Sequence, residues 1–193
     1  NENITAPVLS GATGTATGAT TATGNVTTTG QPANGNIYRY TSQSITPPSP
    51  ADNVSGAGAD AHTTHAVTTE GAQTLVGITG LTNSATYYNH FYHVDGDGLA
   101  SNQDTSASFT TSALPTITTD PLINYSGTVQ ASQSGWVANV YTRSTGVLVV
   151  RKTGLSTDAS GVLSFTDALL SAATSYLVTV DNGTLFGSQE IST

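Results

Sequence analysis

The chain has 193 residues, of which 8% are charged, and its 4 basic residues are set against 12 acidic ones for a net charge of -8. So few basic side chains cannot neutralise a phosphate backbone or hold an anionic bilayer, so nucleic-acid and membrane-surface partners are excluded. No apolar run is long enough to span a bilayer, and the lack of cysteine removes disulfides, thiolate metal ligands and thiol nucleophiles. The 36 threonines and 21 serines favour strands, because a branched Cβ stiffens the threonine side chain. This composition predicts an all-β protein.

Charge and a proline divide the chain into two segments. Residues 1–112 carry one basic and seven acidic residues, whereas residues 113–193 carry three basic and five acidic ones. The join at Ser112-Ala113-Leu114-Pro115 follows a strand-like run, and a proline cannot donate to a strand ladder. We therefore expect two tandem domains, residues 1–112 and residues 113–193, with residues 1–6 forming an N-terminal arm on the first.

Short strand-like runs separated by turn residues fill the first segment. Residues 13–29 alternate threonine with glycine, alanine and valine, so their side chains bury little area. A proline cluster follows residue 46, and residues 51–72 are expected to form a long surface excursion. Such short strands, bounded by turns, are typical of a β-sandwich. The expected strands are residues 8–10, 37–41, 74–78, 86–94 and 106–111.

A corner motif lies within Gly80-Leu81-Thr82-Asn83-Ser84-Ala85-Thr86-Tyr87-Tyr88. A strand, a turn at residues 95–98 and a last strand ending at Thr111 follow it. The pattern resembles fibronectin type III domains over residues 5–112, where a leucine precedes a tyrosine by six positions. This resemblance implies that Leu81 closes the end of the sandwich and that the Tyr87 hydroxyl bonds to the loop backbone. The pattern also resembles modules of bacteriophage virion proteins and of some bacterial surface proteins.

The second segment has a different signature. Runs at residues 136–141 and 147–150 flank a Thr-Gly turn, and Asp158 and Gly161 precede a further alternating run. This pattern resembles the transthyretin-like or carboxypeptidase-regulatory-like sandwich. Asp158 can bond to its own turn and Gly161 can adopt positive φ, which would fix that hairpin. Residues 176–180 and 185–191 predict a closing hairpin, while residues 167–173 form either a short helix or a loop. The resemblances together imply two tandem immunoglobulin-like or fibronectin III-like β-sandwich domains.

Two His-x-x-His pairs, His62 with His65 and His90 with His93, are candidate metal ligands. Residues three apart on a strand face opposite sides, so neither pair can chelate one ion by itself. A zinc site would need one histidine of each pair together with Asp60 or Asp95. The alternative is that these histidines are half-buried and bonded to neighbouring carbonyls. In a further interpretation, the face that carries Tyr88, His90 and Tyr92 meets a neighbouring subunit.

Two other groups of charged residues allow a functional and a structural interpretation. Asp95-Gly96-Asp97-Gly98, with Asp104, suggests calcium, but the EF-hand pattern lacks its third acidic position and its terminal glutamate, and a hairpin turn explains the same residues. Arg143, Arg151 and Lys152 form either a small anion patch or edge charges that prevent strands of different molecules from pairing. The structural interpretation is favoured for both groups.

No sequence signature of an enzyme is present. The chain lacks Gly-x-Ser-x-Gly, His-Glu-x-x-His and a phosphate-binding glycine loop, and its only glutamates are Glu2, Glu70 and Glu190. We therefore expect a non-catalytic protein with no catalytic, cofactor-binding or metal-binding residues and no cofactor.

The resemblance implies a structural or adhesive component of a bacteriophage virion surface, either a capsid decoration protein or a head or tail fibre component. The expected partners are other virion proteins and host surface glycans, with no nucleic acid and no membrane insertion, and the chain would be oligomeric in the particle. The alternative is a bacterial cell-surface or secreted adhesion or carbohydrate-binding module. In that case Trp136 and the cluster of Tyr87, Tyr88 and Tyr92 are the candidates for stacking on sugar rings.

Overall fold

The computed structural model describes residues 5–30, 34–124 and 126–193. These residues form fifteen strands and one short helix, which confirms the all-β fold class. The chain divides into two compact units, of which unit 1 ends at Ala113 and unit 2 is Leu114–Thr193, next to the boundary expected from the sequence. Within the described residues, no helix has the length and apolar character needed to cross a membrane. The first four residues of the expected N-terminal arm lie outside the described residues.

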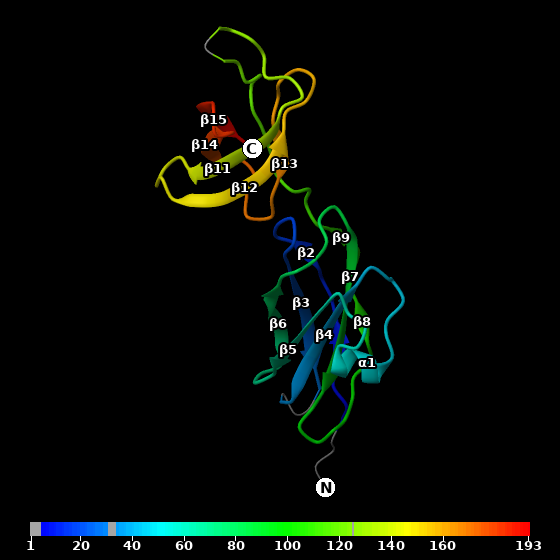
Figure 1. The fold of residues 1–193 in the computed structure, drawn as a ribbon. Helices are drawn as coiled ribbons and strands as arrows, with labels where there is room; N and C mark the ends of the chain where they lie inside the picture. The colour runs from blue at the N-terminus through cyan, green and yellow to red at the C-terminus, as the bar shows by residue number, and fades with distance from the viewer. Residues whose placement is uncertain (1–4, 31–33, 125) are drawn as a thin grey trace. The chain divides into compact units, whose positions relative to one another are not determined.

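Unit 1 consists of two antiparallel sheets (Figure 1). In the first sheet β3 lies between β1 and β2 and also pairs with β6; in the second the order is β5-β4-β7-β8, with β9 also on β7. The first sheet comprises β1 (Val8–Ser10), β2 (Thr15–Ala16), β3 (Ala22–Thr29) and β6 (Gly71–Ile78). The second comprises β4 (Asn36–Ser42), β5 (Ala61–Ala66), β7 (Thr86–Val94), β8 (Asp104–Thr105) and β9 (Phe109–Thr110).

The surface excursion expected over residues 51–72 is wrong. These residues contain most of helix α1 (Pro50–Ser55), all of β5 and the start of β6. Ser49 caps α1 by accepting a hydrogen bond from the Asp52 N–H, and Gly56 ends the helix with a φ of 74°. This segment therefore supplies β5 as an edge strand of the second sheet, and α1 packs against β4 and β7.

Unit 2 has one long sheet and one short one (Figure 1). The long sheet has the order β12-β11-β14-β15, and the short one pairs β10 with β13. Its strands are β10 (Thr116–Thr118), β11 (Ser134–Thr142), β12 (Leu148–Ser156), β13 (Ser164–Thr166), β14 (Ser175–Asp181) and β15 (Phe186–Ser192). The closing hairpin predicted from the sequence is β14 with β15, and no helix lies at residues 167–173, which form turns.

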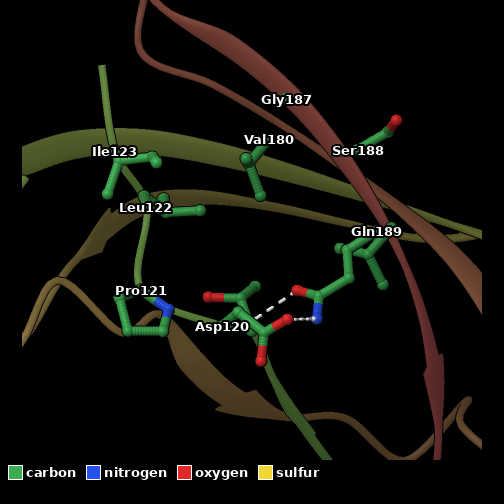
Figure 2. Close-up of a pocket in the computed structure, with 10 residues that line it drawn as sticks. Asp120, Pro121, Leu122, Ile123, Val180, Gly187, Ser188 and Gln189 are labelled. Carbon is green, nitrogen blue, oxygen red and sulfur yellow. Dashed lines mark hydrogen bonds between the residues drawn. The ribbon is translucent and has the colours of Figure 1, made fainter. Parts of the chain in front are cut away.

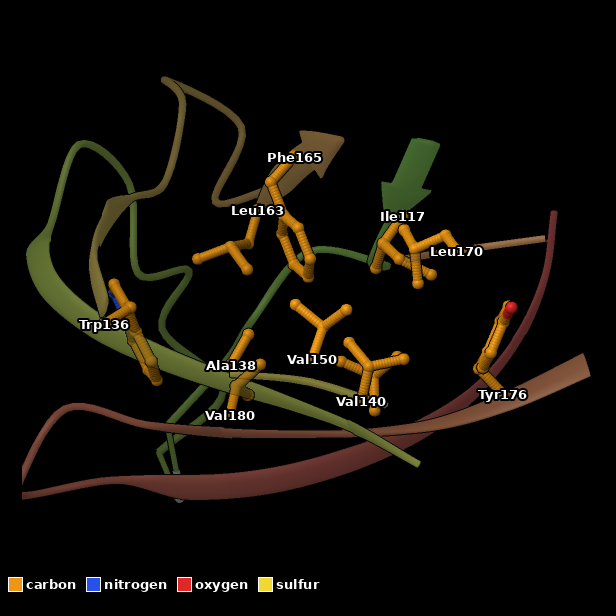
Figure 3. Close-up of a cluster of buried hydrophobic side chains, with 11 residues drawn as sticks. Ile117, Trp136, Ala138, Val140, Val150, Leu163, Phe165, Leu170, Tyr176 and Val180 are labelled. Atoms are coloured by element: carbon orange, nitrogen blue, oxygen red, sulfur yellow. The ribbon is translucent and has the colours of Figure 1, made fainter. Parts of the chain in front are cut away.

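The core of unit 2 is apolar and lies between these sheets (Figure 3). Leu163 and Phe165 point from the β13 side toward Val140, Val150 and the other residues of β11, β12 and β14. Trp136, which is 1% exposed, closes one end of this core. The alternating burial along β14, where every second residue is buried, is the period expected of a strand with one face on a core.

The corner predicted in unit 1 is confirmed. The Tyr87 hydroxyl accepts a hydrogen bond of 2.9 Å from the Thr82 N–H, and both Leu81 and Tyr87 are buried. Ser84 adopts a positive φ of 53° within the loop. Thr111 ties the corner to the last strand, because its hydroxyl donates to the Thr82 carbonyl over 2.7 Å.

Unit 2 repeats this corner with different residues. The Tyr176 hydroxyl accepts from the Ser171 N–H over 2.8 Å, Leu170 is buried and Ala173 has a φ of 53°. Thr193 takes the place of Thr111, because its hydroxyl donates to the Ser171 carbonyl over 2.6 Å. The two units therefore share one device, which consists of a leucine, a tyrosine six positions later and a threonine directly after the last strand of the unit.

Replacing either corner tyrosine with phenylalanine tests this device. Tyr87→Phe and Tyr176→Phe should each lower the free energy of unfolding of their own unit by about 1 kcal/mol, because one hydrogen bond is lost from a buried loop. Urea unfolding followed by Trp136 fluorescence reports unit 2, and NMR spectra report unit 1. Tyr141→Phe is the control, since the Tyr141 hydroxyl makes no hydrogen bond within the described residues. An equal loss of stability in the control would contradict the assignment.

Candidate functional site

Half-buried aromatic side chains gather on the outer face of the β5-β4-β7-β8 sheet. Tyr38 on β4 lies opposite Tyr92 on β7, and its ring stacks on that of His62 with 6.3 Å between ring centroids. Their neighbours Ile37 and Arg39 are buried on the inner face, so the strand alternation turns these rings outward. We call Tyr38, His62 and Tyr92 the aromatic face. Aromatic rings on a polar surface can stack on sugars or on apolar groups of a partner.

The segment that carries α1 covers the rest of this outer face. His90 Nε2 bonds to the Ser44 carbonyl and His62 Nε2 to the Asn53 carbonyl, each over 2.9 Å. Asn53 is fully buried and its side-chain amide donates to the His90 carbonyl over 3.4 Å. Burial lowers the pKa of His90, although its bond to Ser44 acts in the opposite direction. Two of the four histidines therefore hold this segment on the sheet.

The other two histidines face inward. His93 bonds to the Thr28 hydroxyl over 2.9 Å and to the Asn34 carbonyl over 2.6 Å, while His65 bonds to the Gln73 side chain over 3.2 Å. Strand β4 separates β5 from β7, so the two histidine pairs are about 9 Å apart or more across the sheet. No group of three His, Cys, Asp or Glu side chains among the described residues is placed to hold a metal ion. The structure does not bring together the residues of the hypothetical zinc site.

Asp95 forms a turn of the kind favoured by the sequence. Its Oδ1 accepts from the N–H groups of Asp97 and Leu99, and Gly98 has a φ of 84°. The same five-residue turn occurs twice in unit 2, where the Asp158 and Asn124 side chains each accept two N–H bonds from residues two and four positions later. The turn predicted at Asp158 and Gly161 is thus confirmed, but the hairpin is wrong, because the turn joins β12 of the long sheet to β13 of the short sheet and these two strands do not pair. Asp104 instead accepts from the Ala12 N–H over 2.9 Å, away from the Asp95 turn.

The basic residues of unit 2 do not form a joint patch. Arg143 pairs with Glu190 at 2.6 Å and Lys152 pairs with Asp167 at 2.7 Å. Arg151 and Lys152 lie on β12, which is an edge strand of the long sheet. This placement fits the interpretation as edge charges.

Two of the expected sugar-stacking residues are unavailable. Trp136 and Tyr87 are each 1% exposed, because both fill the core of their unit. Tyr88 and Tyr92 remain half-buried on the outer face, and Tyr38 joins them there. Sequence reasoning missed Tyr38, although its alternation with Ile37 and Arg39 on one strand carries the signal.

Arg39 is an unusual core residue of unit 1. It is 0% exposed, and its Nη2 donates to the Val76 carbonyl over 2.6 Å, whereas Nε and Nη1 have no partner among the described residues. Burial lowers the pKa of its guanidinium to about 10. Arg39 pairs with Phe91, which lies four residues after the corner Tyr87. In unit 2, the residue four positions after Tyr176 is Val180, which pairs with Ala138, so Ala138 occupies the equivalent position. A guanidinium thus occupies a site that an apolar residue fills in the other unit.

A hollow of about 220 Å³ lies in unit 2 between residues 119–123 and the strands β14 and β15 (Figure 2). Val178, Val180 and Gly187 line one side of it. Asp120 and Gln189 bridge it, because the Asp120 N–H donates to Gln189 Oε1 and Gln189 Nε2 donates to the Asp120 carboxylate. Among the described residues that line it, Asp120 is the one ionisable residue, and its carboxylate accepts the bond from Gln189.

No family model and no curated protein matches the chain. Among solved structures, the chain is similar to an alpha-L-rhamnosidase of Streptomyces avermitilis complexed with L-rhamnose, at 11% sequence identity and a TM-score of 0.31. The match covers 97% of this chain and 24% of the rhamnosidase, so the chain spans about a quarter of that protein.

Arg39→Met should stabilise unit 1 by about 1 kcal/mol or more. Methionine keeps the buried stem and removes a charge that has no carboxylate partner in the part of the chain that the structure describes, and such replacements are neutral to stabilising. Arg39→Ala is the matched control and should destabilise, because it leaves a cavity. Urea unfolding monitored by NMR measures both variants. A clear loss of stability in Arg39→Met would mean that the guanidinium has a partner that compensates its burial.

Unit 1 should lose stability as the pH falls below about 6.5. Because burial lowers the pKa of folded His90, the unfolded chain binds a proton first, and each step of acidification favours unfolding until the folded pKa is passed. Urea unfolding between about pH 8 and pH 5 should show this loss, and His90→Gln should reduce it. Unit 2 contains no histidine and serves as the internal control. A pH effect that is the same in His90→Gln would contradict the assignment to His90.

Proposed function

We propose that this chain is a non-catalytic structural or adhesive component of a bacteriophage virion surface, either a capsid decoration protein or part of a head or tail fibre. The phage assignment depends on the resemblance of the corner motif and its flanking strands to virion modules. The proposed structural role is supported by the hydrogen bonds that ionisable side chains make within the protein. All four histidines bond to the protein's own backbone or side chains, and so do Asp95 and Asp158 in their turns.

Each unit would act as a rigid spacer that presents its outer surfaces. The observation that carries this proposal is that both units have their own buried core and the same corner, whose hydrogen bonds come from the chain itself. Polar, hydroxyl-rich strand faces interact with a partner through many weak contacts, and repeated copies on a particle multiply their effect. The proposed partners are other virion proteins and host surface glycans, and the proposed location is the virion surface.

The alternative function is a bacterial cell-surface or secreted adhesion module that binds carbohydrate. The aromatic face favours it, because Tyr38 and Tyr92 lie side by side on a sheet and present their rings outward. Flat aromatic pairs of this kind suit the apolar faces of sugar rings. Glycan binding by this surface would also serve a virion protein that attaches to its host.

Purified particles distinguish the two functions. For a virion component, mass spectrometry should detect the chain in gradient-purified phage particles, and cryo-electron microscopy should show tandem β-sandwiches repeated on the capsid or tail. Recovery of the chain only from the cell surface or the secreted fraction would contradict the virion proposal and favour the adhesion module.

A glycan array tests the aromatic face. Tyr92→Ala should lower glycan binding by about tenfold, because a stacking ring is lost. Tyr141→Ala is the matched control, since Tyr141 is a half-buried tyrosine of unit 2. Equal binding by the wild type and Tyr92→Ala would exclude this face as the glycan site.

A further inference from the structure

β15 is an edge strand with unpaired backbone groups. It pairs with β14 over seven residues without a register shift, and within the described residues no strand pairs with its other edge. The Thr193 N–H donates to the Thr174 carbonyl, and the Asn182 N–H donates to the Leu185 carbonyl. The backbone groups of odd-numbered residues along β15 therefore point toward β14. Backbone groups alternate along a strand, so those of Ser188 and Glu190 face the open edge.

The opposite edge of the same sheet is protected in two ways. The pairing of β12 with β11 has three register shifts, and β12 carries Arg151 and Lys152. Bulges and basic side chains are the devices that keep an edge strand from pairing with another chain. β15 has a regular register, and its one charged residue, Glu190, is paired with Arg143. The β12 edge is therefore protected against pairing with another chain, whereas the β15 edge lacks both kinds of protection.

A groove bordered by exposed apolar side chains lies beside the open edge. It begins at the hollow of about 220 Å³ over Gly187, where strand β15 has no side chain (Figure 2). It continues into a second hollow of about 390 Å³ beside Ile123, Leu185 and Phe186. Phe186 is 75% exposed and Ile123 is 62% exposed, so large apolar side chains border the groove and remain open to solvent.

Unit 1 fills the corresponding seam with its own chain. There β1 pairs with β3, and Leu9, which is 3% exposed, packs in the core. The Leu9 N–H and carbonyl also bond to the Asn102 side chain, close to β8 on the other sheet. In unit 2 the seam between the sheets holds the bridge between Asp120 and Gln189, with a hollow beside it. An extended segment is thus the kind of occupant that this fold accepts at the seam.

We propose that the groove along β15 accepts an extended strand of a partner protein, which pairs with the backbone of Ser188 and Glu190. A branched aliphatic side chain of this strand enters the hollow over Gly187, and a basic side chain lies near Asp120, the acidic residue of the lining. A second copy of this chain is a poorer occupant, because its net charge of -8 repels its own kind. This inference goes beyond the proposed function, since the groove would accept such a strand on a virion or on a cell surface.

The experiment uses short random peptides selected against the full chain, with affinities of the enriched peptides measured by calorimetry. The enriched peptides should alternate apolar and polar residues, carry a basic residue and protect the Ser188 and Glu190 amides from hydrogen exchange. Gly187→Leu should lower their affinity by about tenfold or more, because its side chain fills the hollow. A Cβ at Gly187 meets only Val180 Cγ2 at 3.6 Å, an ordinary contact, so this variant should fold.

Thr153→Leu is the matched control, because it places the same side chain at an exposed position of β12, on the opposite edge of the sheet, and should keep the affinity. Ser188→Pro removes a backbone N–H from the open edge without affecting the β14 ladder and should also weaken binding. Unfolding followed by Trp136 fluorescence checks that every variant is folded. Three results would overturn the proposal: no enriched peptide, equal affinity for Gly187→Leu, or protection mapped to another surface. A dimer in solution that Gly187→Leu abolishes would overturn the choice of occupant.

Discussion

A hydrogen bond from a loop N–H to the hydroxyl of a buried tyrosine fixes the closing strands of both units. Tyr87 and Tyr176 stand at the start of β7 and β14, which are interior strands of the five-stranded sheet of unit 1 and of the long sheet of unit 2, so the bond sets where each strand begins. A slip of one residue would turn every side chain of the strand to the other face. The outward position of Tyr92 and the inward position of Val178 and Val180 both depend on this register. The aromatic face and the floor of the groove are consequences of the same corner.

The two units fill equivalent inner positions by different means. Unit 2 uses Val140 and Val178, whereas unit 1 uses Thr41 and Asn89, which bond to each other over 2.7 Å. A buried polar pair contributes less net free energy than an apolar one, because it first loses its bonds to water. Removing one partner of such a pair also leaves the other buried without a hydrogen bond, which lowers the free energy of unfolding further. The stability of unit 1 therefore depends more on individual hydrogen bonds and on pH, and that of unit 2 more on packing.

The sequence was informative where a local pattern carries its own physics. Leu81 and Tyr87 predicted the first corner, and Asp158 with Gly161 predicted a tight turn, because spacing and turn residues suffice there. That this turn joins two sheets instead of forming a hairpin depends on distant contacts. The equivalent corner at Leu170 and Tyr176 escaped notice, since the alanine-rich run before Tyr176 has the composition of a helix and Ala173 adopts a positive φ that alanine rarely takes. The burial of Trp136, the return of residues 51–72 to the sheet and the open edge of β15 depend on contacts between distant residues, so no local pattern could predict them.

Two prolines limit the length of the strand that faces the open groove. Pro115 and Pro121 lie on either side of β10, and neither can donate an N–H to a ladder, so the strand is limited to three residues. β10 and β13, each three residues long, face a sheet whose strands have seven to nine residues. Loops cover part of the long sheet that these short strands leave open, but no strand of the described chain covers the inner face of β15 beside Gly187. In unit 1 the strand that carries Leu9 supplies this cover. The position of two prolines thus decides which unit is closed by its own chain and which keeps an edge for another.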